Sequence, residues 1–326
     1  MIYITGDTHG TIDIRKLLDN QITEKMTKDD YVIICGDFGL VWNHKKETRQ
    51  EKKWLDWLNG RPWTTLFCDG NHECFPRLNA LPVLSWHGGH VHQVRPKILH
   101  LIRGEIFEIN GESFFVMGGA SSHDRGPFKG DTHAVINRSW WPDELPSDEE
   151  LVKGKANLAS HGNKVDYIIT HCLPSPFQEY LKHGAYPNDR LTDYFAELTK
   201  IVKFRHWYSG HYHCNIDVTP RVTVVFSRIM NLGTNIKNSE TVVGFPKYRK
   251  NDTVFFMQGE ETIFGTIKEV MPWGTLVNHQ EPFYDIIPLE QTKKITVRET
   301  EILEKSMIYT GDPIEAEEAE RLGEEE

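Results

Sequence analysis

Four short apolar runs in the sequence each end directly before polar residues. They are IYIT before Gly6-Asp7, YVIIC before Gly36-Asp37, TTLFC before Asp69-Gly70-Asn71-His72, and VDYIIT before His171. Runs of this length, rich in isoleucine and valine and separated by helical stretches, are typical of the buried strands of an α/β sheet. Open α/β sheets bind their ligands at the carboxyl ends of the strands. We therefore expect an α/β fold whose polar strand-end residues form a site.

The apolar residues have helical spacing over residues 12–20, 49–58 and 189–204, which predicts three helices. The last range is the clearest amphipathic helix. The stretch EIFEINGESFFVMGG alternates apolar and polar residues on both sides of Asn110-Gly111, which is a strong signal for a two-residue hairpin. An antiparallel hairpin within a parallel pattern implies a mixed sheet.

The sequence changes character near residue 247. YRKNDTVFFMQGEETIFGTIKEV is rich in strand-forming residues with turn signals between them, and TLVNHQEPFYDII continues in the same way. We predict one large domain over residues 1–240, a small β-barrel or β-meander module over residues 247–309, and a disordered acidic tail over residues 310–326. The module could dock a protein or nucleic acid, cover the site, or build a dimer.

Composition limits the location of the chain and its partners. No run reaches the roughly 18 apolar residues that a membrane helix needs, and the N-terminus lacks a secretory signal, so we expect a cytoplasmic protein without membrane contact. The five cysteines contain no CxxC pair and are expected to be reduced. A net charge of −10 disfavours a broad electrostatic grip on nucleic acid, although it leaves a nucleic-acid substrate open.

The strand ends supply a set of side chains typical of metal ligands. They are Asp7, His9, Asp37, Asn71, His171, His211 and His213, with His72 beside them. Imidazole, carboxylate and amide groups together suit divalent cations such as manganese, iron, zinc or nickel. Seven ligands are too many for one tetrahedral site and too few to saturate two octahedral ions, so water and substrate would fill open positions. Asp37 is the carboxylate that we expect to bridge the two ions.

The motifs GDTHG, GDFG, GNHE, TH and GHYH, in this order, resemble those of the calcineurin-like metallophosphoesterase superfamily. The resemblance implies a four-layer αββα sandwich of two mixed sheets flanked by helices. It also implies two ligand sets, Asp7, His9, Asp37 and His213 for one ion, and Asp37, Asn71, His171 and His211 for the other. His72 matches the family histidine that protonates the leaving oxygen or contacts the phosphoryl group.

This ligand set predicts hydrolysis of a phosphoester bond by a metal-activated hydroxide, because two cations lower the pKa of the water between them. His72 is a suitable general acid because the pKa of free histidine lies near neutral pH. The family's fold also serves as a non-catalytic scaffold in some members. Here every ligand position is filled, which favours an enzyme.

The sequence departs from the protein Ser/Thr phosphatase branch of that superfamily. The stretches GDFGLVW and DGNHE lack the two arginines with which that branch grips a phosphate monoester. A phosphodiester in a nucleotide or nucleic acid is therefore favoured as the substrate, and a phosphomonoester is the alternative. Arg125, in the glycine-rich GGASSHDRG stretch, is a candidate for a replacement phosphate-binding cation, ahead of Arg138 and Arg95.

Other polar and aromatic residues are expected to be structural. Eight further histidines are predicted to be solvent-facing or incidental, namely His44, His87, His90, His92, His100, His123, His133 and His206. Trp140 and Trp141 are expected to pack in a core or an interface rather than to stack on bases.

Overall fold

The computed structural model describes most of the chain in two separate units. The described residues are 1–18, 20–122, 136–137, 140–182, 186–236, 248, 250–259, 261–271, 282–289 and 291–305. The chain divides into Met1–Glu240 and Thr241–Glu326. Over the described residues, no helix combines the length and apolarity needed to cross a bilayer.

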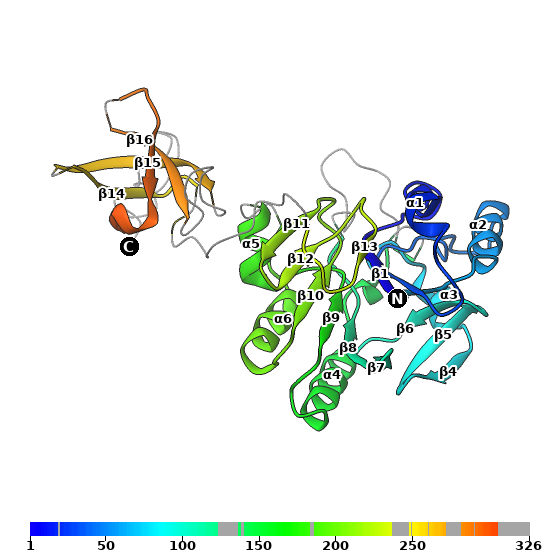
Figure 1. The fold of residues 1–326 in the computed structure, drawn as a ribbon. Helices are drawn as coiled ribbons and strands as arrows, with labels where there is room; N and C mark the ends of the chain where they lie inside the picture. Colours follow the sequence, from blue (N-terminus) through cyan, green and yellow to red (C-terminus); the bar gives the residue numbers. More distant parts are fainter. Residues whose placement is uncertain are drawn as a thin grey trace. The chain divides into compact units, whose positions relative to one another are not determined.

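The first unit contains two mixed sheets (Figure 1). In neighbour order, the first sheet consists of β13 (Met230–Asn231), β1 (Ile2–Thr5), β2 (Tyr31–Cys35), β3 (Thr64–Cys68), β6 (Ile98–Leu101), β5 (Gly89–Arg95) and β4 (Val83–Trp86). The second consists of β11 (Ile216–Thr219), β12 (Val222–Val224), β10 (His206–Ser209), β9 (Tyr167–Thr170), β8 (Glu112–Met117) and β7 (Ile106–Ile109). Strands β1, β2, β3 and β6 are parallel neighbours, as are β8, β9, β10 and β12.

Helices cover the outer face of each sheet. The helical segments are η1 (Ile14–Leu18), α1 (Asn20–Thr23), α2 (Arg49–Asn59), α3 (Phe75–Asn79), η2 (Pro142–Glu144), α4 (Asp148–Ser160), α5 (Ser175–Lys182) and α6 (Arg190–Ile201). Figure 1 shows α1 and α2 beside the first sheet, and α4 and α6 beside the second. The predicted four-layer αββα sandwich is therefore confirmed.

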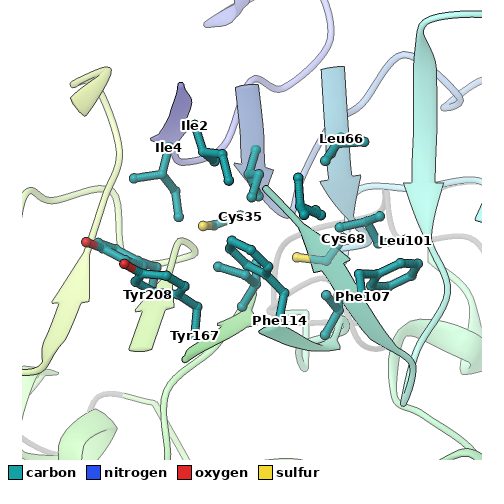
Figure 2. Packing of buried hydrophobic residues seen from close by; sticks show 14 of the residues in the cluster. Ile2, Ile4, Cys35, Leu66, Cys68, Leu101, Phe107, Phe114, Tyr167 and Tyr208 are labelled. Carbon is teal, nitrogen blue, oxygen red and sulfur yellow. The ribbon is translucent and has the colours of Figure 1, made fainter. Parts of the chain in front are cut away.

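The inner faces of the two sheets form one hydrophobic core. Ile4 and Leu66 from the first sheet and Phe114 and Tyr167 from the second belong to the same buried cluster, and their side chains converge in Figure 2. Alternate residues of the same strands point outward, where Ile34 joins the second cluster beneath α2. This two-sided burial explains why the strands read as continuous apolar runs.

Local sequence signals explain where several elements begin and end. Thr48 and Glu51 form a capping box at the start of α2, and Asp189 accepts hydrogen bonds from two backbone amides at the start of α6. Asn110 and Gly111 both have positive φ, 53° and 81°, as a two-residue hairpin turn requires, and they join β7 to β8.

The predicted helix over residues 12–20 is largely wrong. The chain forms the 3₁₀ helix η1 and then the one-turn helix α1. Ile14 and Leu17 are both fully buried, and residues three apart lie on the same side of a 3₁₀ helix. Only these two positions need to face the core, so the segment does not form a longer amphipathic helix.

The second unit contains a five-stranded antiparallel sheet with its own core. In neighbour order its strands are β17 (Ile295–Arg298), β16 (Phe283–Pro288), β15 (Glu261–Met271), β14 (Thr253–Gln258) and β18 (Ile302–Lys305). Phe256, Ile267 and Tyr284 are among the buried residues between its strands. The β-rich character agrees with the predicted module. The boundaries at residues 247 and 309 stay a prediction, and the acidic tail over residues 310–326 lies outside the described residues.

Candidate metal centre

The predicted ligands all follow strands whose carboxyl ends point to one edge of the sandwich. Strands β1, β2 and β3 are parallel neighbours in one sheet, and β9 and β10 are parallel neighbours in the other. The residues that follow them are Asp7 and His9 after β1, Asp37 after β2, Asn71 and His72 after β3, His171 after β9, and His211 and His213 after β10.

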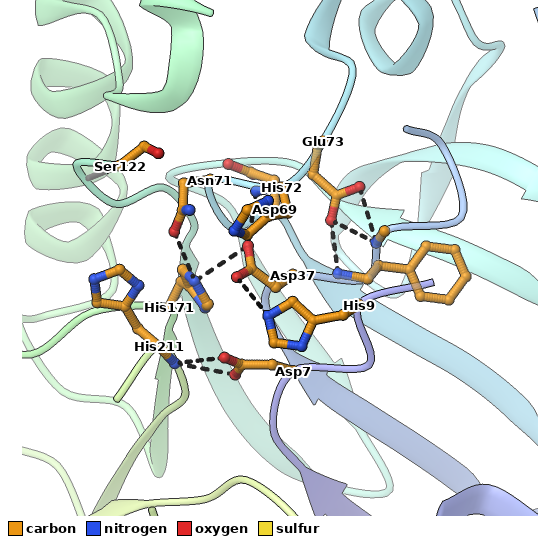
Figure 3. A network of polar contacts seen from close by, with 12 residues as sticks. Asp7, His9, Asp37, Asp69, Asn71, His72, Glu73, Ser122, His171 and His211 are labelled. Carbon is orange, nitrogen blue, oxygen red and sulfur yellow. Dashed lines mark hydrogen bonds and ion pairs between the residues drawn. The ribbon is translucent and has the colours of Figure 1, made fainter. Parts of the chain in front are cut away.

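These side chains converge in space (Figure 3). Ligand atoms lie within 4.8 Å of one another in three overlapping groups, which are Asp7, His9 and His213; His9, Asp37 and His72; and Asp7, Asp37 and His171. Asn71 joins them through His171, whose Nε2 lies 3.3 Å from the Asn71 Oδ1. The ring of His211 lies 4.9 Å from that of His171. The structure thus brings all seven predicted ligands and His72 together.

Asp37 lies at the centre of this cluster and is 1% exposed. Its Oδ2 lies 3.4 Å from the His9 Nε2, and its Oδ1 lies 3.3 Å from the His171 Nε2. The backbone N–H of His72 donates to the same Oδ1 at 2.8 Å. Burial alone would raise the pKa of Asp37, but the charges of His171 and His72 and two histidine hydrogen bonds hold it well below its usual range. A buried carboxylate that stays ionised is a suitable ligand for cations on either side of it.

Asp7 is the second fully buried carboxylate of the cluster. The backbone N–H of His211 donates to both of its carboxylate oxygens, at 3.0 and 3.1 Å, and the His213 Nε2 lies 3.3 Å from its Oδ2. Burial would raise the pKa of Asp7, whereas His213 and His171 lower it, and the net shift is downward. Asp7 therefore ties the β10 loop to the end of β1.

His171 supplies the test of whether this site fits a cation. Its Nδ1–H donates to the backbone oxygen of Cys35 at 2.8 Å, which leaves Nε2 facing the oxygens of Asp37 and Asn71, both 3.3 Å away. Burial lowers the pKa of His171, but Asp37 and Asp7 raise it to about 9. The pocket thus favours positive charge beside Nε2, and a divalent cation held by Nε2 and the oxygens of Asp37 and Asn71 would supply it.

Asp13 is a functional candidate that the motif comparison missed. Its Oδ2 lies 2.7 Å from the Nδ1 of His9, so the Nδ1–H of His9 can donate to it while Nε2 faces Asp37. Carboxylates that orient metal-bound histidines in this way tune the affinity of a site. Asp13 follows His9 by four residues within the turn after β1, and this spacing is the one signal that could have revealed it.

Lys16 is a second missed residue, and its ammonium group is bonded to the backbone next to the cluster. It donates to the oxygens of Gly6, Asp7 and Phe226 at 2.9, 2.7 and 2.5 Å. Burial lowers the pKa of Lys16 to about 8, although Asp7 raises it. The Phe226 ring stacks on His213 with 4.8 Å between the ring centroids. Lys16 therefore holds the end of β1 against the loop that supports His213.

Four of the predicted ligands adopt backbone conformations that are uncommon for residues other than glycine. The φ angles of His9, Asp37, His211 and His213 are 40°, 46°, 69° and 50°. Such conformations persist only where surrounding contacts impose them, and they gather at functional sites. The loops are thus shaped to aim these side chains at the cluster.

Two glycines make room for the ligands. A Cβ atom on Gly36, whose φ is +86°, would lie 2.1 Å from the His171 Nδ1, and one on Gly210 would lie 2.2 Å from the Asp7 Oδ1. Neither ligand could keep its position beside a larger residue, because both pairs would overlap. The glycines of the GD and GH motifs are therefore required by packing.

His72 lies at the side of the cluster next to an aromatic residue. Its ring centroid is 5.3 Å from that of Trp42 and 5.5 Å from that of His9. Trp42 packs in turn on Trp141, which is fully buried, in agreement with the expected packing role of Trp141. His72 is half-buried and lies where a group bound at the cluster could meet it.

Of the three candidate phosphate-binding arginines, Arg95 alone lies among the described residues. Arg125 and Arg138 lie outside the described residues. Arg95, on β5 of the first sheet, forms an ion pair in which its Nη2 lies 2.6 Å from the Oε2 of Glu47. A different arginine, Arg103, reaches the GNHE loop, where its Nε and Nη2 donate to Oδ2 of the buried Asp69 at 2.8 and 2.5 Å.

Of the histidines predicted to be solvent-facing or incidental, three are buried. His92, His100 and His206 are 7%, 3% and 5% exposed and lie on β5, β6 and β10. His92 and His100 point to the outer face of the first sheet, because their neighbours Val91 and Leu99 belong to the inner core. Each has a polar partner. The Nδ1 atoms of His92 and His100 are 2.9 Å apart, and the His206 Nε2 lies 2.7 Å from Oγ1 of Thr223. His123 and His133 lie outside the described residues.

Comparison with known proteins identifies the family of the first unit. The chain is similar to the lariat debranching enzyme from Drosophila pseudoobscura pseudoobscura, with 26% identity over 65% of this chain and 42% of that protein. It is also similar to the lariat debranching enzyme from Schizosaccharomyces pombe, with 23% identity over 64% of this chain and 47% of that protein. The Drosophila melanogaster enzyme is 26% identical over 65% of this chain and 42% of its own length. The chain thus spans less than half the length of these relatives. Residues 1–215 match the model of the calcineurin-like phosphoesterases, and the chain belongs to this family.

Proposed function

We propose that the protein is a phosphodiesterase that uses two divalent metal ions. The observation that carries this proposal is the convergence of two buried, ionised carboxylates, one asparagine and four histidines on one edge of the sandwich. Two carboxylates confined this closely require compensating positive charge. Family membership supports the same chemistry, because calcineurin-like phosphoesterases are hydrolases of phosphoesters.

The two ions would share Asp37. Asp7, His9 and His213 would complete one site, since their ligand atoms form a single group. Asn71, His171 and His211 would complete the other, because they lie on the opposite side of Asp37 in Figure 3. The mixture of nitrogen and oxygen donors suits manganese, iron, zinc or nickel.

When bound, the pair of cations would supply Lewis acidity that makes water nucleophilic near neutral pH and neutralises charge on the phosphoryl oxygens. The remaining tasks fall to residues of the chain. His72 would donate a proton to the leaving oxygen, since its ring lies beside Asp37 and His9 and Trp42 restricts its movement. Asp13 would hold the tautomer of His9 that presents Nε2 to the site.

A diester is favoured over a monoester as the substrate. The two arginines that grip monoesters in the protein Ser/Thr phosphatase branch are missing from the sequence, and Arg103 is already neutralised by Asp69. A diester carries one fewer negative charge at the reacting phosphorus and needs less cationic support. The names of the relatives, which describe the debranching of lariats, point to the same class of bond.

The test is hydrolysis of two chromogenic substrates, a nitrophenyl phosphate monoester and a bis-nitrophenyl phosphate diester. The full chain would be stripped of metal and reloaded with manganese, iron, nickel, zinc or magnesium, and bound metal would be counted by mass spectrometry. We expect about two ions per chain and a higher kcat/KM for the diester. A preference for the monoester would favour a phosphatase, and inactivity in every metal despite stoichiometric loading would favour a scaffold.

A further inference from the structure

Two hollows adjoin on the surface beside η1 and β13. One has a volume of ≈ 480 Å³ and includes Arg15 and Lys16 in its lining, and the other has a volume of ≈ 430 Å³ and includes Lys25. Both are lined by Ile22, Arg228 and Ile229, so they form a continuous depression. We refer to it as the basic groove, defined by Arg15, Lys16, Lys25 and Arg228.

The charge of the basic groove is opposite to that of the whole chain. The protein has 47 acidic and 37 basic residues and a net charge of −10. Among the described residues that line the two hollows, four are lysine or arginine and none is aspartate or glutamate. A concave surface lined by one sign of charge focuses the local potential and attracts counter-ions of the opposite sign. The groove is therefore a candidate site for a polyanion.

One end of the groove adjoins the metal centre. Lys16 lines the groove, and its ammonium group donates to the backbone oxygens of Asp7 and Phe226. Ser227, the next residue after Phe226, also lines the groove, whereas the Phe226 ring stacks on His213. A single layer of residues thus separates the groove from the predicted ligands.

The cations of the groove divide into two roles. Lys16 is only partly exposed and already donates to three carbonyl oxygens, so its function is to hold the backbone. Arg15, Lys25 and Arg228 are exposed residues along the same depression. Arg15 and Lys25 form no ion pair with any described carboxylate. The exposed side chains of Arg15 and Lys25 can therefore contact a ligand from solvent.

We propose that the basic groove binds the phosphate backbone of a single-stranded polynucleotide while one of its diester bonds lies at the metal centre. This proposal rests on the proposed function and extends it from a diester bond to a polymeric substrate. Only a polymer of phosphodiesters can present one linkage to the cluster and neighbouring phosphates to the adjoining cations. Contacts between such cations and phosphates give a salt-dependent affinity that is independent of base sequence.

Binding can be measured without catalysis. The probe is a fluorescein-labelled single-stranded RNA of about 16 nucleotides, titrated with the metal-free full chain while fluorescence anisotropy is recorded at several salt concentrations. The test variant is Arg15→Gln/Lys25→Gln. The control is Lys53→Gln/Lys200→Gln, which removes the same charge from exposed positions on α2 and α6.

We expect the test variant to bind the RNA about tenfold more weakly at low salt, with the slope of log K against log salt reduced by about 1.4, as the loss of two single-strand phosphate contacts requires. The control variant should match the unmodified chain. If both variants bound the RNA equally more weakly, the loss of affinity would be due to net charge alone, and the proposal would be overturned. Competition by polyglutamate as strong as that by unlabelled RNA would also overturn it, because the groove would then be a general polyanion site.

Activity supplies an independent readout. With metal restored, we expect the ratio of kcat/KM for the RNA to kcat/KM for bis-nitrophenyl phosphate to fall about tenfold in the test variant. An unchanged ratio would refute polynucleotide binding by the basic groove and would leave the proposed phosphodiesterase activity unaffected. Failure of the unmodified chain to hydrolyse either substrate in any metal would instead refute the proposed function, and the anisotropy titration distinguishes the two failures.

Discussion

The carboxylate of Asp13 lies 2.7 Å from the Nδ1 of His9, and the opposite nitrogen of the same ring lies 3.4 Å from the carboxylate of Asp37. The imidazole is thus held between two carboxylates, of which Asp13 is part-exposed and Asp37 is buried. An Nδ1–H bonded to Asp13 leaves the Nε2 lone pair directed into the cluster. This pair of contacts defines the tautomer that a metal ligand requires.

We predict that Asp13→Ala lowers the metal affinity of the site by about 10- to 100-fold, because His9 loses the group that orients it. Asp13→Asn should lower the metal affinity less, since an amide oxygen can still accept a hydrogen bond from the Nδ1–H of His9. Metal titration of the stripped chain, followed by calorimetry, measures the change. The matched control is Asp29→Ala, which removes an exposed carboxylate from the turn before β2. Wild-type affinity in Asp13→Ala would contradict the role assigned to Asp13.

Asp37→Asn and His72→Ala are predicted to abolish or cripple hydrolysis by different routes. Asp37→Asn removes the charge shared by His9 and His171, so the chain should lose bound metal. His72→Ala should keep its metal and lose about 10²- to 10⁴-fold in kcat, as expected for a general acid. Metal content and kcat are measured on the same samples. Full metal content in Asp37→Asn would exclude the proposed bridging carboxylate.

Arg103→Met is predicted to destabilise the first unit by about 3–5 kcal/mol, because it leaves the carboxylate of Asp69 buried without its cation. Burial would raise the pKa of Asp69, and it is Arg103 and then His100 that hold it below its usual range. Denaturant unfolding measures the loss. The double variant Arg103→Met/Asp69→Asn should recover part of it, since the uncompensated charge is gone. Equal stability of the single and double variants would show that the uncompensated charge of Asp69 does not cause the loss.

Stability is predicted to fall below about pH 6.5 because of buried neutral histidines. Burial, followed by the charges of Arg205 and Arg221, lowers the pKa of His206 from 6.5 to about 4. Between these two values the unfolded chain binds a proton that the folded chain does not, so acid favours unfolding. Above pH 6.5 both states are neutral at this residue and the effect vanishes.

The contribution of His206 should reach about 1.4 kcal/mol of unfolding free energy per pH unit between the two pKa values. His206→Gln is expected to remove that slope, although it also weakens the contact with Thr223 and lowers stability at neutral pH. Urea unfolding at pH 7, 6 and 5 measures the slope. The exposed His161→Gln should leave it unchanged, and an unaltered slope in His206→Gln would assign the acid sensitivity to other groups.

The strands, the mixed sheets and the residues that meet at the strand ends could be predicted from the amino-acid sequence. Short apolar runs rich in β-branched residues, such as YVIIC, are typical of buried strands, and parallel strands place the residues that follow them along one edge. The Asn110-Gly111 hairpin was equally predictable, because its backbone conformation requires these residue types.

The residues that support the cluster could not be predicted, because they meet through long-range contacts. Lys16 bonds to Phe226, 210 positions away, and Arg103 bonds to Asp69 across 34 positions, so no local pattern connects either pair. The burial of His92, His100 and His206 likewise depends on the layers that cover their strands, and β6 and β10 are buried on both faces. Strand periodicity shows that the two faces alternate, but packing against other layers decides whether one face or both are buried, and those layers come from distant parts of the chain.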